Sequence, residues 1–439
     1  MTRLQKTNVM LLAGGQSLFT ITTITTMALS SVIGQQLAPS PGLATLPAAM
    51  MMLSTLLTTL LASLLMKRIG RRRGFIIGTL NGAMGGLVCF ASVAWGSFAL
   101  LCLGNFFIGL YQSFAMYYRF AATDATAPEF RSRAVSYVMI GGLVAAVLGP
   151  LNARITLDWV PSVPYGGPFL VILVLAVVAG VLINRITLPE PGSRKTSASA
   201  ADAAPLQSTG HINSNADTKA GTDAKTVAST PAGTGTTAID PALAARPLAT
   251  ISKHPGFFPA MLCSGVCFAF MAMYMTVTPL AMQAQGFDMT DTTIVIQTQV
   301  LSMFGPAFVT GGLIARHGLN RIMLTGAVLM LLASLTGAFA DTVPVYMLSR
   351  LCLGIGWNFL FVGSAVLLST THRAAERGKV QGLNDQFMFF LVTIACVGAA
   401  PALHSLGWQN LNLLAGLPVL VALVALVIMV RQTRRRPGS

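Results

Sequence analysis

Apolar stretches of about 20 residues follow one another along almost the whole chain, and they constrain the fold more than any other feature. Each is long enough to cross a bilayer as an α-helix, which pairs its backbone N–H and C=O groups internally where no water reaches them. Only 9% of the 439 residues are charged and the mean hydropathy is +0.70, whereas a soluble domain carries about a quarter charged residues. The sequence therefore predicts an all-α membrane protein with many transmembrane helices.

Twelve spans are predicted from these stretches. In chain order they cover, roughly, residues 8–34, 43–66, 74–95, 98–122, 134–153, 165–184, 256–283, 291–314, 322–340, 344–370, 380–402 and 409–430. A polar interval at residues 190–254 separates the first six spans from the last six. Within it, Ser193–Thr237 is rich in Ala, Thr, Ser, Gly and Asp and almost free of large apolar residues, so burial cannot offset the entropy lost on ordering.

Four segments are expected from this division. They are a first six-helix bundle at residues 1–189, a disordered cytoplasmic linker at 190–254, a second six-helix bundle at 255–431 and a basic cytoplasmic tail at 432–439.

Basic residues are distributed asymmetrically between the two sides of the predicted topology. The formal net charge is +15, and 26 of the 28 Lys and Arg residues fall in the terminal segments and in those loops that would share a side with them. Of the other two, Arg154 falls on the opposite side and Arg350 lies inside a span. The positive-inside rule then predicts that both termini are cytoplasmic. The basic charge fits contact with anionic lipid and does not indicate nucleic-acid binding.

The sequence lacks the motifs that mark enzymes, metal sites and disulfide frameworks. All six cysteines fall within apolar spans, none forms a C-x-x-C pair, and the five histidines are scattered. No G-x-x-x-x-G-K-[ST] phosphate loop and no H-E-x-x-H zinc motif occurs. We therefore expect a protein that is not an enzyme and holds neither cofactor nor metal.

The two halves repeat each other. Shifting Arg68 and Gly70 by 248 residues gives Arg316 and Gly318, in the corresponding loop of the second half. In the fourth span of each half, Asn105 with Gly109 is matched 245 residues later by Arg350 with Gly354. Equivalent loops point the same way in both halves, which indicates a parallel repeat about an axis along the membrane normal.

The loop between spans two and three resembles a motif of the major facilitator superfamily, G-x-x-x-D-R-x-G-R-R. Arg68, Gly70, Arg71 and Arg72 match it, whereas Ser63 and Lys67 replace its first glycine and its aspartate. The resemblance covers all twelve spans and implies a secondary transporter whose two halves rock about a central site. It also implies a gating role for the residues of this loop and of its repeat: Arg68, Gly70, Arg71, Arg72, Arg316, Gly318 and Arg321. Because the acid is replaced in both copies, the family's cytoplasmic charge latch is in question.

In this family, helices one, four, seven and ten face the central cavity, so those spans should carry the substrate contacts. The candidate substrate-binding residues in them are Gln16, Thr20, Thr23, Asn105, Tyr111, Gln112, Tyr274, Arg350, Trp357 and Asn358. Residues seven apart share a helix face, which groups Asn105 with Gln112 and Arg350 with Trp357. For the threonines, a hydroxyl returned to the backbone carbonyl is an equally good explanation.

Arg350 and Asp385 are the two charged residues inside spans that need most explanation. An arginine in a span is costly unless it is paired or hydrated, which favours a functional role. The alternative for Arg350 is that its side chain reaches the outer surface. Asp385, about one turn into span eleven, is the candidate for proton coupling, and capping or pairing near the inner surface is its alternative.

These residues favour a particular substrate class. A lining of amides, hydroxyls, one arginine and aromatic rings, with no acid at its centre, suits a neutral or weakly anionic aromatic solute. The region from Tyr118 to Pro150 resembles bacterial branches of the superfamily that include riboflavin importers, so uptake of a riboflavin-like vitamin is the first hypothesis. The alternative is proton-coupled efflux of a drug or metabolite, supported by the Gly149-Pro150 fragment of an antiporter motif on helix five. A sensor or scaffold that transports nothing is a third reading.

The expected surroundings follow from this reading. We predict a multi-pass protein of the bacterial inner membrane that works as a monomer. Its partners would be a small-molecule substrate, the lipid bilayer and, if transport is coupled, a proton.

Overall fold

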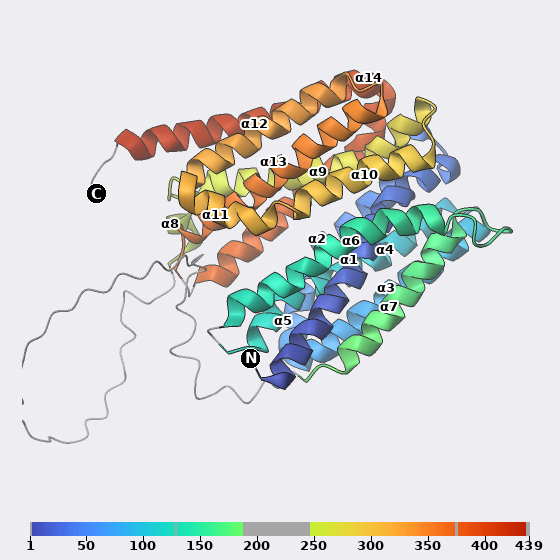
Figure 1. Cartoon of the computed structure of the whole chain (residues 1–439), viewed down its shortest axis with the longest axis horizontal. Coiled ribbons are helices and arrows are strands. Elements are labelled where there is room, and N and C mark those ends of the chain that lie inside the picture. Colours follow the sequence, from blue (N-terminus) through green and yellow to red (C-terminus); the bar gives the residue numbers. More distant parts are fainter. Residues whose placement is uncertain (1, 128–129, 188–245, 374–375, 436–439) are drawn as a thin grey trace, which may run out of the picture.

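The structure, a computed structural model, describes residues 2–127, 130–187, 246–373 and 376–435. Helices of the first half form one bundle and helices of the second half form another beside it (Figure 1). The first half contains α1 (Arg3–Leu37), the short η1 (Pro41–Leu43), α2 (Leu46–Ile69), α3 (Arg71–Ala94), α4 (Phe98–Ala115), α5 (Tyr118–Asp124), α6 (Arg131–Ile155) and α7 (Gly166–Asn184). The second contains α8 (Leu248–Ile251), α9 (Phe257–Ala284), α10 (Met289–Phe304), α11 (Ala307–His317), α12 (Leu319–Ala338), α13 (Val343–Ser369) and α14 (Arg377–Arg435).

Most of these helices are long enough to cross a membrane. Within the described residues, nine helices pass by length and composition, or ten if α10 and α11, bent by 45° at Gly305 and Pro306, are taken as one span. The 59 residues of α14 would extend roughly 90 Å as one straight helix, about three times the hydrocarbon thickness. Gly407, with φ 74°, breaks α14 into two segments. The predicted all-α membrane fold is confirmed, while the count of twelve requires two spans in α14 and one in α6, whose apolar part is Ile140–Ile155.

The packing of the two halves repeats. In the first half α1 packs on α6, α3 on α7, and both α2 and α3 pack on α4. In the second half α9 and α12 pack on α14, and both α10 and α12 pack on α13. Since α14 takes the places of both α6 and α7, the predicted parallel repeat is confirmed at the level of helix contacts.

The same repeat holds for individual side chains at the glycines of α4 and α13. A Cβ added to Gly109 would collide with the carbonyl oxygen of Met51 and with Ser54. A Cβ added to Gly354 would collide with the carbonyl oxygen of Gln299 and with Ser302, which lie 248 residues after Met51 and Ser54. The glycine shared by the two copies therefore lets two helix backbones approach closely, as small residues do in membrane bundles.

Glycine is also required in the loop that carries the superfamily motif. Gly70 ends α2 with φ 87° and Gly318 ends α11 with φ 86°. Residues with a Cβ rarely adopt this conformation, whereas glycine does so at little cost. The glycine of the motif is thus explained by a tight turn between antiparallel helices.

The halves contact each other through α1 with α9, α2 with α14 and α6 with α10. In Figure 1 they meet at the right-hand end and diverge toward the left-hand end, where the two chain termini lie. Following the predicted orientation, we call the end with the termini the inner end and the opposite end the outer end. At the outer end the backbone N–H of Ala400 donates to Thr45 Oγ1 at 3.2 Å, and Gly42 lies against Pro401.

Several glycines near the inner end have open space beside them. A Cβ added to Gly311 or Gly312 of α11, or to Gly378 or Gly382 of α14, would meet no atom within 4 Å. Each of these four glycines has room for a side chain, in contrast to Gly354.

Most of the predicted linker, from residue 190 to 245, lies outside the described residues, as do residues 436–439 of the predicted tail. The residues that flank the linker are held in place. Asn8 Nδ2 donates to the Thr187 carbonyl oxygen at 2.7 Å, in the first half. In the second half, Arg246 donates from Nε and Nη2 to the two oxygens of the fully buried Glu376 carboxylate, each at 2.8 Å.

Substituting Gly354 tests the close packing of the repeat. Gly354→Ala places a Cβ 2.7 Å from the Gln299 carbonyl oxygen, which should destabilise the protein by about 1–3 kcal/mol through overpacking. Gly382→Ala, where nothing lies within 4 Å, is the control and should be neutral or stabilising because alanine favours a helix. Thermal unfolding of the purified proteins in detergent measures both, and equal melting temperatures would contradict the repeat packing.

The Arg246–Glu376 pair should make stability depend on pH. Hydrogen bonds from Arg246 hold the pKa of the Glu376 carboxyl well below its ordinary value of 4.5. A carboxyl with a depressed folded-state pKa stabilises the fold above its unfolded pKa and loses that effect as pH falls. We expect Glu376→Gln to lower the melting temperature at pH 7 and the difference from wild type to shrink below about pH 4.5. A difference that stays constant with pH would argue against the pair, and Asp341→Asn, at an exposed site, is the control.

Candidate substrate site

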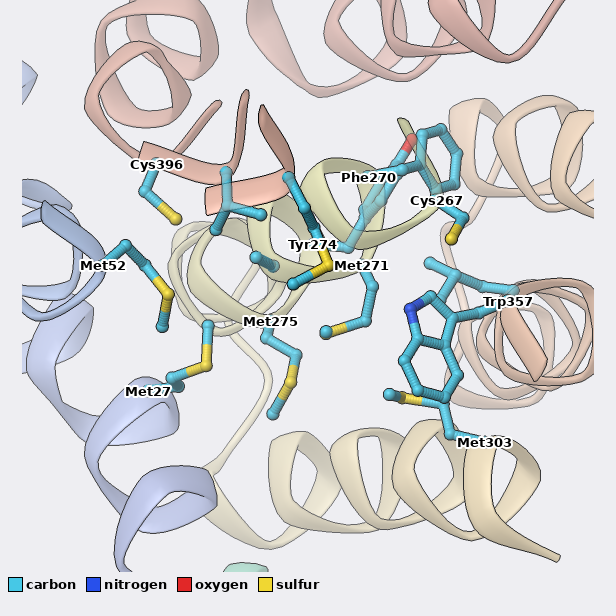
Figure 2. Close-up of a cluster of buried hydrophobic side chains, with 14 of the residues drawn as sticks. Met27, Met52, Cys267, Phe270, Met271, Tyr274, Met275, Met303, Trp357 and Cys396 are labelled. Carbon is cyan, nitrogen blue, oxygen red and sulfur yellow. The ribbon is translucent and has the colours of Figure 1, made fainter. Parts of the chain in front are cut away.

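A cluster of methionines lies where the two halves meet. Met27 of α1, Met52 of α2, and Met271 and Met275 of α9 are each at most 6% exposed, and Figure 2 shows them gathered around one region. We call these four residues the thioether cluster. Methionine is unbranched and polarisable, so it can repack around different neighbours and contacts aromatic rings favourably. The cluster joins the halves with side chains that tolerate movement.

Beside the thioether cluster, aromatic rings of the second half pack together. The rings of Trp357 and Phe361 on α13 are stacked, with centroids 4.8 Å apart and planes at 11°, and Phe268 of α9 lies 5.5 Å from each. Phe304 of α10 lies 6.5 Å from Trp357. We call these four residues the aromatic cluster. Phe268, Phe304 and Phe361 are only half-buried, so the cluster keeps an accessible edge.

Trp357 connects the aromatic cluster to the thioether cluster. Its indole Nε1 is buried and has no hydrogen-bond partner, and Figure 2 shows this nitrogen on the side of Met271. A buried N–H without an acceptor is rare in proteins and costs about 1–3 kcal/mol. Within the described part of the chain, this donor is thus left without an acceptor at the centre of the molecule.

Arg350, the arginine predicted to lie inside a span, is fully buried within the second half. Its Nη1 donates to Thr278 Oγ1 at 3.2 Å and its Nη2 to Ser349 Oγ at 2.9 Å. The guanidinium carbon lies 4.1 Å from the centre of the Tyr274 ring and 5.9 Å from that of Trp408. We call Tyr274, Thr278, Ser349 and Trp408 the arginine cage.

No carboxylate belongs to this cage. Among the described residues the ion pairs are Arg71–Asp124 and Arg246–Glu376, and Arg350 is in neither. Hydroxyl acceptors and aromatic faces satisfy part of the guanidinium, while its buried Nε has no partner. The alternative in which Arg350 reaches the outer surface does not occur in this conformation, because its side chain is 0% exposed.

The first half carries a neutral version of the same site. Asn105, equivalent to Arg350 in the repeat, accepts from Ser30 Oγ at 2.8 Å and donates to the Leu101 carbonyl oxygen at 2.9 Å. Ser30 lies 248 residues before Thr278, and Cys89 lies 248 residues before Gly337. A Cβ on Gly337 would lie 3.1 Å from Arg350 Nη2, so the smaller residue leaves room for the larger side chain.

Three other predicted residues are also buried inside their own half. Tyr111 is 0% exposed, with its ring 5.3 Å from that of Phe19. Gln112 is 8% exposed and its Oε1 has no partner. Asn358 is 2% exposed, accepts from Thr310 Oγ1 and donates to the Met303 carbonyl oxygen. Their predicted contact with substrate stays a prediction.

The predicted polar stripe on α1 is partly accessible. Gln16 and Thr23 are half-buried, whereas Thr20 is 8% exposed. Thr20 Oγ1 donates to the Gln16 carbonyl oxygen at 2.8 Å and Thr23 Oγ1 to that of Phe19 at 3.2 Å. The threonine hydroxyls are thus returned to the backbone, and Gln16 Nε2 donates to Thr20 Oγ1 at 3.0 Å, which leaves the Gln16 side-chain carbonyl to accept a further hydrogen bond.

The predicted gating residues make their described contacts within one half. Arg71 pairs with Asp124 at 2.6 Å and Arg72 Nη2 donates to Asn184 Oδ1 at 2.9 Å. Arg68, Arg316 and Arg321 are exposed. In this conformation Arg71 and Arg72 brace the inner end of the first half, and the described contacts of the motif do not join the two halves.

Asp385, the predicted coupling residue, lies between residues that contact both halves. Its neighbour Asn384 accepts from Ser264 Oγ of α9 at 2.7 Å, and Gln386 Nε2 donates to the Leu56 carbonyl oxygen of α2 at 3.2 Å. The guanidinium of Arg119, on α5 of the first half, acts electrostatically on the Asp385 carboxylate. Asp385 and Arg119 thus belong to opposite halves and form no direct ion pair.

The structure brings together residues that are far apart in the sequence. It joins Tyr274 to Arg350, places Trp357 beside the thioether cluster, and leaves Asn105, Tyr111, Gln112 and Asn358 in separate packing sites. Our sequence analysis missed Phe268, Trp408 and Asn412, whose Oδ1 accepts from the Tyr274 hydroxyl at 2.7 Å. The signal for Asn412 was available, since an amide inside an apolar span needs a partner.

Comparison with known proteins identifies the family. The model of the Major Facilitator Superfamily matches residues 11–316 and again 260–439, so it covers both halves. The chain belongs to the major facilitator superfamily. It is thus a secondary membrane transporter, as its resemblance to the superfamily implied.

The relatives of this superfamily member include transporters of several kinds. It is 34% identical over 422 residues to the riboflavin transporter RfnT of Brucella anthropi, which covers 96% of this chain and 95% of the relative. It is 25% identical to the MFS-type transporter YdeG of Bacillus subtilis, over 85% of this chain and 79% of that protein. Among solved structures it is similar to the human organic anion transporter MFSD10, with a TM-score of 0.63 at 14% identity over 97% of this chain and 100% of that one. It is also similar to the fucose:proton symporter FucP of E. coli, with a TM-score of 0.55 at 13% identity over 97% of this chain and 99% of that one. At such low identity, the MFSD10 and FucP structures support the fold alone.

Proposed function

We propose that this transporter carries a planar aromatic solute of the riboflavin type into the cell by alternating access. The observation that carries the proposal is the aromatic cluster, which lies beside the meeting point of the halves and has an accessible edge. A flat ring can stack on such an edge, and the unpaired Trp357 N–H can bind an acceptor on that ring. The 34% identity to a riboflavin transporter along almost the whole chain supports the same substrate class.

The polar groups around this region fit a solute without a strong positive charge. The Gln16 side-chain carbonyl and the Trp357 N–H offer hydrogen bonds, while no carboxylate belongs to the aromatic cluster. A cation would prefer a carboxylate close to the rings. The lining therefore favours a neutral or weakly anionic ring system over a cationic drug.

The conformation fits the release step of uptake. The helix ribbons of the two halves meet at the outer end and diverge toward the inner end (Figure 1), and on this arrangement a solute would leave toward the side of the termini, which the loop charges predict to be the cytoplasm. The thioether cluster would repack as the halves rock, because methionine side chains have several low-energy conformations.

Closure of the inner end would bring Arg119 and Asp385 together. Each lies on a different half, and Arg119 Nε is buried without a partner. We assign to this pair the inner charge latch that the replaced motif acid does not provide. The gating roles of Arg68, Gly70, Arg71, Arg72, Arg316, Gly318 and Arg321 are then to brace the helix ends that move as rigid bodies.

Uptake of labelled riboflavin by a riboflavin-auxotrophic bacterial strain tests the function. Wild type should restore growth and uptake, and Trp357→Ala should reduce uptake about ten-fold, since losing a stacking contact of about 1.4 kcal/mol has that effect. Trp95→Ala is the control, because Trp95 is 76% exposed on the outer side of α3. The proposal fails if well-expressed wild type takes up no riboflavin, in which case resistance to toxic compounds is measured to test efflux.

Substitution of Asp385 tests proton coupling. If Asp385 carries the proton, Asp385→Asn should abolish accumulation driven by a proton gradient and keep exchange of labelled for unlabelled solute. Asp291→Asn, at the outer end of α10, should behave like wild type. Accumulation by Asp385→Asn that remains sensitive to a protonophore would remove Asp385 from the coupling mechanism.

A further inference from the structure

A cavity at the outer end is built by both halves. Its volume is about 320 Å³, at the lower end of the range of small-molecule sites. The first half contributes Gln35, Pro41 and Ala44, and the second half contributes residues of α9 and α14, including Gln285 and Trp408. Because two halves that rock against each other form its walls, this cavity must change shape during transport.

Trp408 belongs both to this cavity and to the arginine cage. It lines the cavity, and the centre of its ring lies 5.9 Å from the guanidinium carbon of Arg350. Its ring also contacts the rings of Tyr346, at 5.5 Å, and Tyr274, at 6.2 Å. Arg350 itself does not line the cavity and is 0% exposed, so Trp408 lies at the boundary between an open space and a buried cation.

The position of Trp408 in the chain allows its ring to move. It directly follows Gly407, the positive-φ residue that breaks α14, and a Cβ added to Gly407 would meet nothing within 4 Å. The indole Nε1 of Trp408 has no hydrogen-bond partner. The residue is tied through its backbone, since Asn412 Nδ2 donates to the Trp408 carbonyl oxygen at 2.7 Å. A side chain at a helix break without a side-chain hydrogen bond can rotate without breaking the fold.

The packing of the repeat does not explain why the cage contains a cation. In the first half, Asn105 and Cys89 fill the equivalent site without a charge. In the second half the charge is desolvated, no carboxylate compensates it, and Gly337 leaves space for it. A guanidinium held in this way has unused capacity to bind an oxygen acceptor, and arginine binds adjacent oxygen atoms with two parallel hydrogen bonds.

We propose that Trp408 is a movable lid between the outer cavity and Arg350, and that with the lid displaced Arg350 binds the oxygen-bearing edge of the incoming planar solute. The ligand class is a flat ring that carries neighbouring acceptor atoms on one edge, such as a carbonyl oxygen beside a ring nitrogen, or a carboxylate. This inference rests on the proposed function for its direction, since the cavity lies at the end from which uptake begins. It adds an outer binding step before the solute reaches the aromatic cluster.

Chemical modification of arginine tests the lid independently of transport. Purified protein is treated with phenylglyoxal, and modification of Arg350 is followed by peptide mass spectrometry. We expect slow modification in wild type and in Trp95→Ala, and modification about ten-fold faster in Trp408→Ala. Trp408→Phe keeps a ring and should stay close to wild type. Melting temperature and gel filtration of each variant exclude unfolding as the cause of faster modification.

Protection by ligands tests the role of Arg350. In Trp408→Ala, riboflavin and benzoate are each added before phenylglyoxal. Slower modification with either one supports binding of an oxygen-bearing ring at Arg350. If Arg350 in folded Trp408→Ala is modified no faster than in wild type, the lid is overturned. If it is modified quickly but neither compound slows it, the binding role is overturned, whatever the outcome of the riboflavin uptake measurement.

Discussion

A bilayer gives the backbone of this chain no hydrogen-bond partner except itself, and the rest of the structure depends on that constraint. It requires helices, and it removes the hydrophobic driving force between them, so close contact of small residues holds the helices together. Gly109 and Gly354 show the consequence, because each brings a helix backbone against a carbonyl oxygen of its neighbour at equivalent places in the two halves. The breaks at Gly305 and Gly407 lie where the chain bends or turns.

The two halves share one fold but differ in residue size at equivalent positions, where a small residue in one half corresponds to a large residue in the other. In the first half Gly82 accommodates the ring of Tyr111, whereas in the second Met330 faces Gly356. The same kind of difference distinguishes the neutral site around Asn105 from the arginine cage. Each difference in size keeps the helices packed while changing the polarity or charge of the side chains. The second half can therefore carry the aromatic cluster and Arg350 within the same helix packing.

The contacts between the halves are of a different kind from those within them. Within each half, glycines and paired hydroxyls make tight, specific contacts, and such packing resists deformation. Between the halves, the thioether cluster and a few single hydrogen bonds make contacts that can be broken and formed again. Two rigid bundles joined by adaptable side chains are the physical requirement for alternating access.

The sequence by itself determined the membrane helices, the parallel repeat and the family. Hydropathy, charge asymmetry and glycine spacing are properties of single segments, and they decide how a segment sits in a bilayer without reference to distant helices. It also singled out Arg350 and Trp357, since polar groups inside apolar spans need partners. Only the tertiary structure decided what those partners are. Tyr111 and Asn358 share helix faces with plausible ligands in the sequence but are buried in their own half, while Phe268, Trp408 and Asn412 join the central residues from other helices. Which side chains face the centre depends on helix rotation and on the halves' relative position, and both are set by packing between residues more than a hundred positions apart in the chain.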